Sequence, residues 1–324
     1  MSSPAGLPAA EAAGSPAGPT AGPPADEAGG PGADKAANSP ADKAGVLVEA
    51  LPYIRRFWGL TVVIKYGGNA LAASDADLDP LATFATDVVL MRSVGMRPIV
   101  VHGGGPQIGE MMSRLGKVPR FIDGLRVTDA ETLDIARMVL VGKVNRDIVS
   151  AINVHGALAV GVSGEDAGLL NAEARHPDLG FVGDVASVNP DLLLRLIAED
   201  LIPVVATIGS DETGQSYNIN ADTAAGALAV AVGAAKLVYL TDVDGIRTDR
   251  HDPATRLSRV TTADLDAMIA SGAVDGGMIP KVRSCIEAVV GGVASAHVLD
   301  GSAPHALLLE IFTHEGVGTM VVPS

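Results

Sequence analysis

Cysteine and aromatic residues are scarce in this sequence. Among its 324 residues there is one cysteine, Cys285, and aromatic residues make up 3% of the chain. A lone cysteine can form neither an internal disulfide nor a zinc site built from cysteine pairs. Because Cys285 lies in an apolar helical pattern, we expect a buried thiol in the core. The lack of disulfides fits the reducing environment of the cytoplasm.

Basic residues are also few. The 23 lysines and arginines face 38 acidic residues, which gives a formal net charge of -15. Because nucleic acids are bound by clustered lysine and arginine, this balance argues against a nucleic-acid partner. The mean hydropathy is positive, +0.31, yet the longest uncharged stretches, such as 223–235, are shorter than the ~18 residues that a membrane span needs. We therefore expect no membrane partner, and the N-terminus lacks the pattern of a secretory signal.

The first part of the chain lacks the side chains that build a core. Between residues 8 and 45 there is no Val, Ile, Leu, Met, Phe, Trp or Tyr. Nothing there could offset the entropy lost on ordering, so residues 1–45 are predicted to be disordered. From residue 46 the composition changes and predicts a helix over 46–59, followed by a folded domain over 60–324. The helix carries an apolar stripe of Leu47, Leu51, Ile54 and Trp58.

Short apolar runs alternate with longer amphipathic stretches in the folded domain. This rhythm predicts an α/β fold, a three-layer αβα sandwich with a mainly parallel central sheet. In such folds, ligands bind beyond the carboxyl ends of the strands. The strand patterns cover 61–64, 98–101, 158–162, 202–206, 237–240 and 296–299, and the helical patterns cover 107–115, 130–141, 191–198, 221–232 and 282–289.

Two further segments are typical of antiparallel hairpins. Residues 179–190 alternate apolar and small polar residues, which suggests a hairpin inserted between the two halves of the domain. Near the C-terminus, the apolar runs 306–312 and 318–322 flank a His-Glu-Gly turn. We expect them to form a closing hairpin.

Two glycine-rich turns follow strand patterns, at 67–68 and 103–105. Backbone N–H groups in such turns can face an anion, and a proline after the second turn favours a helix start with free N–H groups of its own. Lys65, at the end of an apolar strand, and Lys281 supply the positive charge that a transferring phosphoryl group requires. Together they predict a phosphoryl-transfer site. The alternatives are that the glycine triplet is only a tight turn and that Lys65 extends to water.

Arg126 and the run 217–223 add candidate substrate contacts. The guanidinium of Arg126 suits bidentate capture of a carboxylate, although an ordinary surface ion pair would also explain it. In the run, Asn218 and Asn220 could contact substrate while Asp222 holds the two lysines by charge. Alternatively, Asn220 or Asp222 only caps the helix that follows.

The loop 241–245 contains repeated acidic residues directly after a strand pattern. This position suits a loop that faces a nucleotide, but its Asp-Gly pair is equally a plain turn signal. No Walker sequence, Gly-x-Gly-x-x-Gly motif, zinc-protease motif or nucleophile elbow occurs, so the chain is neither a P-loop protein nor a dinucleotide-binding protein of the common type.

Five ordered motifs resemble those of the acetylglutamate kinases, within the amino acid kinase family. They begin at Ile64 (IKYGGNA), Val101 (VHGGGPQ), Gly124 (GLRVT), Asn218 (NINAD) and Gly276 (GGMIPK). The resemblance covers about residues 46–324. It implies an open αβα sandwich whose N-terminal half binds N-acetyl-L-glutamate and whose C-terminal half binds ATP with Mg²⁺. The implied product is N-acetyl-L-glutamyl 5-phosphate, in the second step of arginine biosynthesis.

The resemblance also implies a role for each motif position. The transferring phosphoryl group would be stabilised by the two lysines, and the acceptor carboxylate, already ionised at neutral pH, would need no general base. No protein metal site is implied, because Mg²⁺ would be bound mostly by phosphate and water. The implied catalytic residues are Lys65, Lys281 and Asp222, the substrate-binding residues Gly104, Gly105, Arg126, Asn218 and Asn220, and the nucleotide-binding residues Gly67, Gly68, Thr241, Asp242 and Gly245.

The helix over 46–59 resembles an extra N-terminal helix found in arginine-inhibited members of the family. In those members such helices interlace dimers into a hexamer, so we expect a homo-oligomer, a hexamer built as a trimer of dimers, with L-arginine as inhibitor. The alternative is a helix packed on its own subunit. By the same resemblance, the arginine site consists of Tyr53, Arg56, His297, Glu310 and Gly316.

Other activities share this fold and stay open as alternatives. A carbamate, aspartate or glutamate kinase would use the same phosphate site with a different acceptor. The motifs at 124–128 and 218–222 fit the acetylglutamate pattern better. A non-catalytic arginine sensor is a further alternative, and the presence of both Lys65 and Lys281 argues against it.

Overall fold

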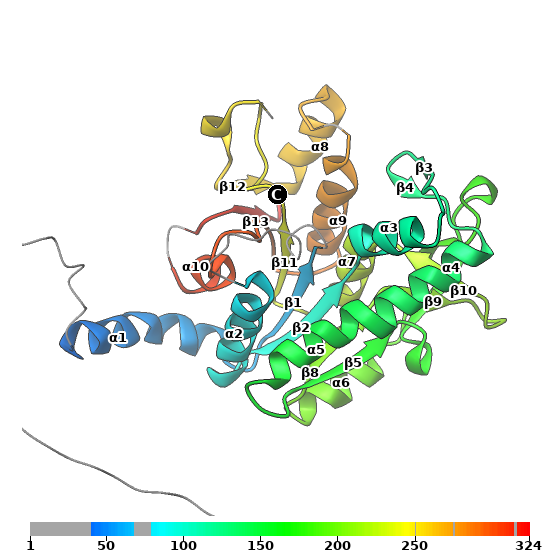
Figure 1. The fold of residues 1–324 in the computed structure, drawn as a ribbon. Helices are drawn as coiled ribbons and strands as arrows, with labels where there is room; N and C mark the ends of the chain where they lie inside the picture. The colour runs from blue at the N-terminus through cyan, green and yellow to red at the C-terminus, as the bar shows by residue number, and fades with distance from the viewer. Residues whose placement is uncertain (1–39, 68–78, 250, 275, 314–315) are drawn as a thin grey trace, which may run out of the picture. The chain divides into compact units, whose positions relative to one another are not determined.

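The computed structural model describes residues 40–67, 79–249, 251–274, 276–313 and 316–324 (Figure 1). Leu47–Ser324 form one compact unit. The predicted disorder of residues 1–39 lies outside the described residues. Helix α1 spans Pro40–Phe57 and includes Pro52, so it begins six residues before the predicted helix. Its first turn begins with Pro, Ala, Asp, Lys and Ala, which allow a helix to start without apolar residues.

A sheet of eight strands forms the centre of the fold (Figure 1). Its six strands from β13 to β5 are mutually parallel, as the alternation of strand and helix patterns predicted. The strands, in order across the sheet, are β12 (Arg259–Thr261), β14 (Thr319–Val322), β13 (Ser295–Asp300), β11 (Lys236–Thr241), β1 (Thr61–Tyr66), β2 (Arg97–His102), β8 (Ile202–Ala206) and β5 (Ala159–Ser163).

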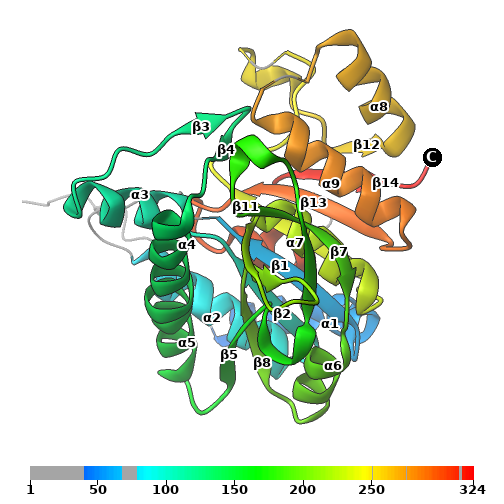
Figure 2. The same ribbon diagram turned by 90° about the vertical axis from the view of Figure 1, so that its right-hand side faces the viewer.

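Helices cover both faces of this sheet (Figures 1 and 2). Alternate strand residues point to opposite sides, so Val62 and Ile64 join one core and Val63 joins the other. The three-layer αβα arrangement is therefore confirmed. The first core is covered by α2 (Pro80–Ser93), α3 (Gly105–Arg114), α4 (Ala130–Arg137), α5 (Asn145–Asn153) and α10 (Ala306–Phe312), and the second by α6 (Asp191–Ala198), α7 (Ala221–Ala231), α8 (Thr262–Ser271) and α9 (Met278–Val290).

The predicted hairpin over 179–190 is wrong in its extent. Residues Val182–Val188 form one strand, β7, which pairs antiparallel with β6 (Leu170–Ala174). The alternating pattern thus belongs to a single strand, and the chain turns before it, at Gly180 with φ +66°. Together with β9 (Ile208–Ser210) and β10 (Ser216–Ile219), these strands form a small closed sheet.

The predicted C-terminal hairpin is also wrong. Ala306–Phe312 is helix α10, because Leu307 and Ile311, four residues apart, are both buried on one helix face. The second run is strand β14, which pairs antiparallel with β13 and parallel with β12. An apolar run of seven residues cannot be assigned to strand or helix by length alone.

The remaining elements are short. A π-helical segment, η1 (Met138–Val144), joins α4 to α5 into one continuous helix that extends beyond the predicted 130–141. In the described part of the chain no helix is both long and apolar enough to cross a membrane. Cys285 is buried and free, as predicted. The other elements are β3 (Phe121–Ile122), β4 (Leu125–Arg126) and the 3₁₀ turns η2 (Asp166–Gly168), η3 (Pro177–Leu179) and η4 (Pro253–Thr255).

The central strands should carry most of the stability. Ile99 on β2 is fully buried, whereas Val118 is 83% exposed. We expect Ile99→Ala to lower the free energy of unfolding by about 2–5 kcal/mol, because the lost side chain leaves a cavity. Val118→Ala should change it by less than about 0.5 kcal/mol. Urea unfolding of both variants tests this, and equal effects would contradict the assignment of the core.

Candidate active site

The two predicted lysines meet at one carboxylate. Lys65 comes from the end of β1, Asp222 from the first turn of α7 and Lys281 from the first turn of α9. Lys65 Nζ lies 2.8 Å from Asp222 Oδ1, and Lys281 Nζ donates a hydrogen bond of 3.0 Å to Oδ2. All three side chains are at most 15% exposed. The alternative in which Lys65 extends to water is therefore wrong.

Charge pairing dominates the electrostatics of this cluster. Burial raises the pKa of Asp222, but the ammonium groups of Lys65 and Lys281 outweigh burial and hold that pKa at about 2. Burial in turn lowers the pKa of Lys65, against the opposing effect of Asp222. Because one carboxylate faces two cations, the cluster keeps an excess positive charge when all three groups are ionised. That excess suits an anionic ligand.

Tyr239 contacts both Asp222 and Lys281. Its hydroxyl donates a hydrogen bond of 3.1 Å to the carbonyl oxygen of Asp222, and its ring lies 5.4 Å from Lys281 Nζ. Tyr239 is fully buried in β11. A rigid aromatic side chain therefore ties the helix start that carries Asp222 to the central sheet, and it faces Lys281 with its π system.

The glycine triplet opens helix α3. Gly104 is the N-cap residue and has no side-chain capping bond, so the first-turn N–H groups stay available to an anion. A side chain could not replace it, since a Cβ at Gly104 would lie 2.7 Å from Leu140 Cδ2 and 3.2 Å from Val144 Cγ2. Both of these residues belong to the π-helical segment. The triplet is thus a close packing point as well as a turn.

His102 and Asn145 fix the start of this loop. His102 is fully buried, and burial lowers its pKa to about 4, so the ring is neutral at pH 7. Its Nε2 lies 3.1 Å from Asn145 Nδ2 and accepts from that amide, which also donates to Val204 O over 2.8 Å. Nδ1–H therefore donates to Gly103 O, 2.9 Å away. Neither residue had a predicted role, although His102 directly precedes the triplet.

A cavity of about 220 Å³ brings the predicted substrate residues together. Beside it, Arg126 Nη2 donates to Gly105 O over 2.8 Å, and the guanidinium stacks over Phe121 at 4.8 Å. Arg126 is therefore held by the glycine loop, not by a surface carboxylate as the alternative supposed. Asn218 Nδ2 lies 3.5 Å from Thr128 Oγ1. The cavity is lined by Lys65, Gly104, Gly105, Arg126, Asn218, Asn220 and Asp222, among others.

Two predicted site residues also make contacts within the fold. The side chain of Asn220 caps α7, accepting from the N–H groups of Asp222 and Thr223 over 2.8 and 3.2 Å, which is the structural alternative. The N–H of Gly67 donates to Leu240 O over 3.2 Å, so it is not a free donor for phosphate. Gly67 instead allows close packing, because a Cβ there would lie 2.9 Å from that carbonyl oxygen. Gly68 lies outside the described residues.

The acidic loop after β11 borders a separate cavity of about 560 Å³. Asp242 and Gly245 line it, while Thr241 is buried and donates to Asp242 Oδ1 over 3.0 Å. Gly245 has φ +145°, and a Cβ there would lie 2.5 Å from Thr319 Oγ1. The loop therefore needs glycine at this position in order to pack against the C-terminal strand.

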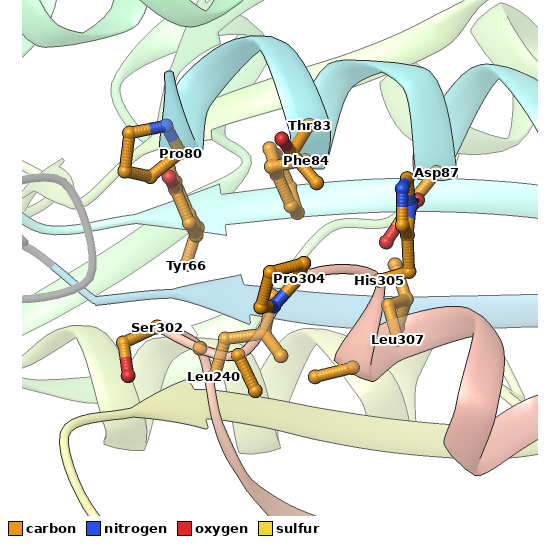
Figure 3. A pocket seen from close by; sticks show the side chains of 13 residues that line it. Tyr66, Pro80, Thr83, Phe84, Asp87, Leu240, Ser302, Pro304, His305 and Leu307 are labelled. Atoms are coloured by element: carbon orange, nitrogen blue, oxygen red, sulfur yellow. Dashed lines mark hydrogen bonds and ion pairs between the residues drawn. The ribbon is translucent and has the colours of Figure 1, made fainter. Parts of the chain in front are cut away.

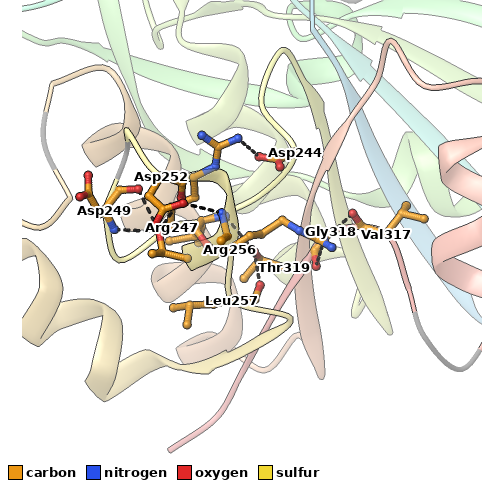
Figure 4. Close-up of polar contacts among 12 residues, drawn as sticks. Asp244, Arg247, Asp249, Asp252, Arg256, Leu257, Val317, Gly318 and Thr319 are labelled. Carbon is orange, nitrogen blue, oxygen red and sulfur yellow. Dashed lines mark hydrogen bonds and ion pairs between the residues drawn. The ribbon is translucent and has the colours of Figure 1, made fainter.

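Polar contacts join the segment that follows this loop to the C-terminal segment (Figure 4). Arg256 donates to the carbonyl oxygens of Val317 and Gly318 over 2.6 and 3.0 Å. The N–H of Ile246 donates to Thr319 Oγ1 over 2.8 Å, and that hydroxyl donates to Leu257 O. These bonds hold this segment and residues 317–319 as one unit.

A second polar cluster lies on the face of the sheet that carries α10. His297 on β13 donates from Nδ1 to Glu310 Oε1 over 2.6 Å, and Lys236 Nζ donates to His297 Nε2 over 2.8 Å. Burial lowers the pKa of Lys236 to about 8. Glu310 Oε2 accepts from the N–H groups of Val317 and Gly318. The structure therefore brings the predicted His297 and Glu310 together.

The other predicted members of this cluster stand around it. A Cβ at Gly316, where φ is +59°, would lie 2.8 Å from Glu310 Oε2. Tyr53 packs against the core that α10 covers. The guanidinium of Arg56 lies 5.4 Å from the ring of Phe57. Lys236 was missed by the sequence analysis. Its signal was a lysine at the start of an otherwise apolar strand, the same signal that marked Lys65 at a strand end.

Comparisons with known proteins agree with this geometry. The profile of the amino acid kinase family matches residues 60–300. An acetylglutamate kinase of Symbiobacterium thermophilum is 57% identical over 289 residues, which are 86% of this chain and 97% of that protein. An acetylglutamate kinase of Saccharopolyspora erythraea is 53% identical over 288 residues, covering 87% of this chain and 93% of the relative.

Solved structures show the same fold. An N-acetylglutamate synthase from Neisseria gonorrhoeae, complexed with coenzyme A and N-acetyl-glutamate, superimposes with a TM-score of 0.76 at 26% identity. The match covers 87% of this chain and 63% of the synthase. A carbamate kinase from Giardia lamblia bound to AMP-PNP has a TM-score of 0.62 at 19% identity, covering 82% of this chain and 99% of the kinase.

The chain therefore belongs to the amino acid kinase family and is a kinase, and the predicted fold class is confirmed. Its resemblance to the acetylglutamate kinases, read from five motifs, is confirmed by relatives of that name at 51–57% identity over most of the chain.

The paired carboxylate gives a pH-dependent prediction. Asp222→Asn leaves two buried lysines without a counter-ion, so at pH 7 we expect the free energy of unfolding to fall by about 3–5 kcal/mol. The folded pKa of about 2 lies below the ordinary 3.8. The stabilisation from ionised Asp222 is therefore complete above about pH 5 and is lost as the pH falls through 2. The gap between wild type and variant should thus be about 1 kcal/mol smaller at pH 3 than at pH 7.

Urea unfolding at both pH values measures this gap. Asp178→Asn serves as the matched control, because its side chain is 78% exposed. A gap for Asp222→Asn that is as small as the control's, or that does not narrow at pH 3, would contradict the ion-pair account.

Proposed function

We propose that the protein transfers the γ-phosphoryl group of ATP to the side-chain carboxylate of N-acetyl-L-glutamate, forming N-acetyl-L-glutamyl 5-phosphate in the second step of arginine biosynthesis. The names of the relatives support this substrate, as does a structural neighbour complexed with N-acetyl-glutamate. The observation that carries the proposal is the cavity in which Arg126 and Asn218 stand beside the Lys65–Asp222 pair.

The acceptor explains the residues found in the cavity. A carboxylate is already a nucleophile at pH 7, so no general base is needed, and the transfer requires positioning and charge stabilisation. Arg126 would bind the α-carboxylate of the substrate. Asn218 would accept or donate hydrogen bonds at the amide of the substrate. The N–H groups at the start of α3 would hold the reacting carboxylate against the lysines.

The lysines would act on the charge that moves in the transfer. As the γ-phosphoryl group leaves ADP, negative charge spreads over its oxygens, and preorganised ammonium groups stabilise that charge without reorienting. Asp222 would keep both Nζ atoms in place. Lys65 contacts Oδ1 of Asp222 and Lys281 contacts Oδ2. This arrangement would space the two ammonium groups for a ligand between them.

ATP would occupy the cavity beside Asp242 and Gly245, next to the start of α9. Mg²⁺ would enter with ATP. Among the described residues no group of three or more metal-ligating side chains lies together, and a magnesium ion bridging phosphates needs few protein ligands, since phosphate oxygens and water supply most of them.

An acceptor panel tests the substrate. We expect ADP release with N-acetyl-L-glutamate and trapping of an acyl phosphate by hydroxylamine, with catalytic efficiency at least ~100-fold above that for L-glutamate, L-aspartate or carbamate, because unpaired polar groups penalise the wrong acceptor. A preference for another acid would show that this acid, and not N-acetyl-L-glutamate, is the substrate. Absence of turnover with all four would favour the non-catalytic sensor.

We further propose that L-arginine inhibits the enzyme by binding at Lys236, His297 and Glu310. A structural neighbour of the chain is an N-acetylglutamate synthase complexed with L-arginine. The cluster offers Glu310, only 5% exposed, to a guanidinium and Lys236 to a carboxylate. Arginine carries both groups, so it complements the cluster at its two ends.

The contacts around Glu310 suggest how inhibition would reach the nucleotide. Glu310 accepts hydrogen bonds from the N–H groups of Val317 and Gly318. Arg256 donates to their carbonyl oxygens (Figure 4). An arginine that draws Glu310 away would release these two N–H groups. The loop around Gly245 packs on Thr319 and would shift with them.

Exposed apolar residues on α1 and directly after it support the predicted oligomer. Leu51 and Trp58 of the apolar stripe are 47% and 66% exposed, and Val48 is 68% exposed. We propose that these side chains pack against other copies of the chain in a hexamer.

Substitution of the central carboxylate tests the arginine site. Glu310→Gln removes the charge while keeping the shape, and we expect the arginine concentration for half-inhibition to rise at least ~10-fold, the scale of a lost charged hydrogen bond. Inhibition assays at saturating substrates measure it, with Glu199→Gln on the exposed end of α6 as the matched control. Unchanged inhibition in Glu310→Gln would refute the site.

A further inference from the structure

A third cavity lies on the other side of β1 from the paired lysines. Its volume is about 390 Å³, within the range of small-molecule sites. Lys65 and Tyr66 are neighbours on β1, so their side chains point to opposite faces of the sheet. Lys65 joins the Asp222 cluster, and Tyr66 lines this cavity together with residues of α2 and of the loop 301–305 (Figure 3). None of its lining residues carries the proposed catalytic chemistry.

The body of the cavity is apolar and aromatic. Tyr66 and Phe84 stack face to face with ring centroids 4.0 Å apart, and both are buried. Leu240, Pro304 and Leu307 complete the apolar lining (Figure 3). Such walls favour a flat or aliphatic ligand and exclude a strongly hydrated one such as a nucleotide phosphate.

One end of the cavity is acidic. Pro80, Thr83 and Asp87 follow one another on the same face of α2, about one turn apart, so Asp87 stands about 10 Å along the helix from Pro80 (Figure 3). The Asp87 side chain is only 4% exposed. Its polar partner among the described residues is His305, whose Nδ1 lies 2.6 Å from Oδ1. A buried carboxylate whose partner is a histidine, which can be neutral, favours the binding of a cation.

Apart from His305, the described lining of the cavity holds no basic side chain. The described residues that line the cavity include neither lysine nor arginine, and Asp79, the N-cap of α2, adds a second carboxylate near Tyr66. His305 itself is held in the left-handed region, with φ +58°. A non-glycine residue in this region stores strain, which is common where a side chain must be presented to a ligand.

The opposite end offers an unpaired hydroxyl. Tyr66 is 1% exposed, and its hydroxyl has no hydrogen-bond partner among the described residues. A buried hydroxyl without a partner is costly, so a ligand oxygen beside it would be stabilised. In Figure 3 Tyr66 and Pro80 stand at one end of the cavity and Asp87 and His305 at the other.

We propose that this cavity is a second ligand site, which binds a small primary amine with an aromatic or apolar body. The ammonium group pairs with Asp87, the body lies along Phe84, and a polar atom at the far end meets Tyr66. The site shares no residue with the proposed substrate and arginine sites. Because Tyr66 is covalently joined to Lys65, and Leu307 lies on the helix that carries Glu310, a ligand there contacts elements of both.

Tyramine is a suitable probe, since its ammonium and phenol groups are separated by an apolar ring. We expect saturable binding with a dissociation constant of about 1 mM or lower in a saturation-transfer NMR titration of the full chain. The matched ligand 3-(4-hydroxyphenyl)propionate has nearly the same shape with a carboxylate in place of the amine. It should bind at least ~10-fold more weakly, because its charge repels Asp87.

Variants of α2 test whether tyramine binds in this cavity. Thr83→Phe projects into the cavity and should abolish saturable tyramine binding, whereas Thr86→Phe, on the exposed side of the same helix, should leave it unchanged. Asp87→Asn should weaken tyramine at least ~10-fold and make the two ligands bind alike. Thermal unfolding of each variant confirms that it is folded.

The outcomes separate the proposal from its rivals. Equal binding of tyramine and the propionate to the wild type would show a merely apolar cavity and overturn the proposal. Tyramine binding that survives in Thr83→Phe as well as in Thr86→Phe would place the site elsewhere and overturn it too. No saturation of the wild type below about 20 mM, far above the expected constant, would likewise refute it.

Discussion

The ion pairs of Asp222 are the constraint on which the site depends. One carboxylate joins the end of β1 to the first turns of α7 and α9. A buried cation without a counter-ion is costly, so neither lysine could stay at the carboxyl edge of the sheet without Asp222. The capped start of α7, the hydroxyl of Tyr239 and the strand order that places β1 beside β11 all serve to hold this carboxylate.

The alternation of side chains along a strand divides the molecule's chemistry between two faces. On β1, Lys65 takes part in the proposed transfer, while Tyr66 faces the cavity next to α2. On β11, Lys236 joins the cluster with His297 and Glu310 on one face, and Tyr239 supports Asp222 on the other. The proposed arginine site and the proposed transfer site therefore lie on opposite faces of the same central strands.

Much of this architecture could be predicted from the sequence because it rests on local patterns. The parallel core follows from short apolar runs, and Lys65 and Lys281 stand out because lysine is unfavourable in such surroundings. The errors have equally physical causes. The run at 306–312 is too short for its period to decide between strand and helix, and 182–188 alternates without revealing that its partner, β6, precedes it. Asn220 caps α7 through Oδ1, as the sequence allowed, and its contact with substrate stays a prediction.

Other features depend on contacts between distant segments and leave no pattern in the sequence. The ring orientation of His102 depends on the hydrogen bond from Asn145, 43 residues away, and the pairing of Asp87 with His305 spans 218 residues. The contact of Lys236 with His297 depends on the pairing of β11 with β13. Gly67 could be read as a phosphate donor from its turn, but its N–H is taken by Leu240 of the neighbouring strand.

The central claim is that the two lysines act as one device through a shared carboxylate, and a double-mutant cycle tests it most directly. Turnover of N-acetyl-L-glutamate would be measured for Lys65→Met, Lys281→Met and the double variant. Each single change should lower kcat by at least ~100-fold, and the double change should cost little more than the larger single loss, because residues that act as a unit are not additive. Losses that simply multiply, or near-normal turnover in either single variant, would contradict the account.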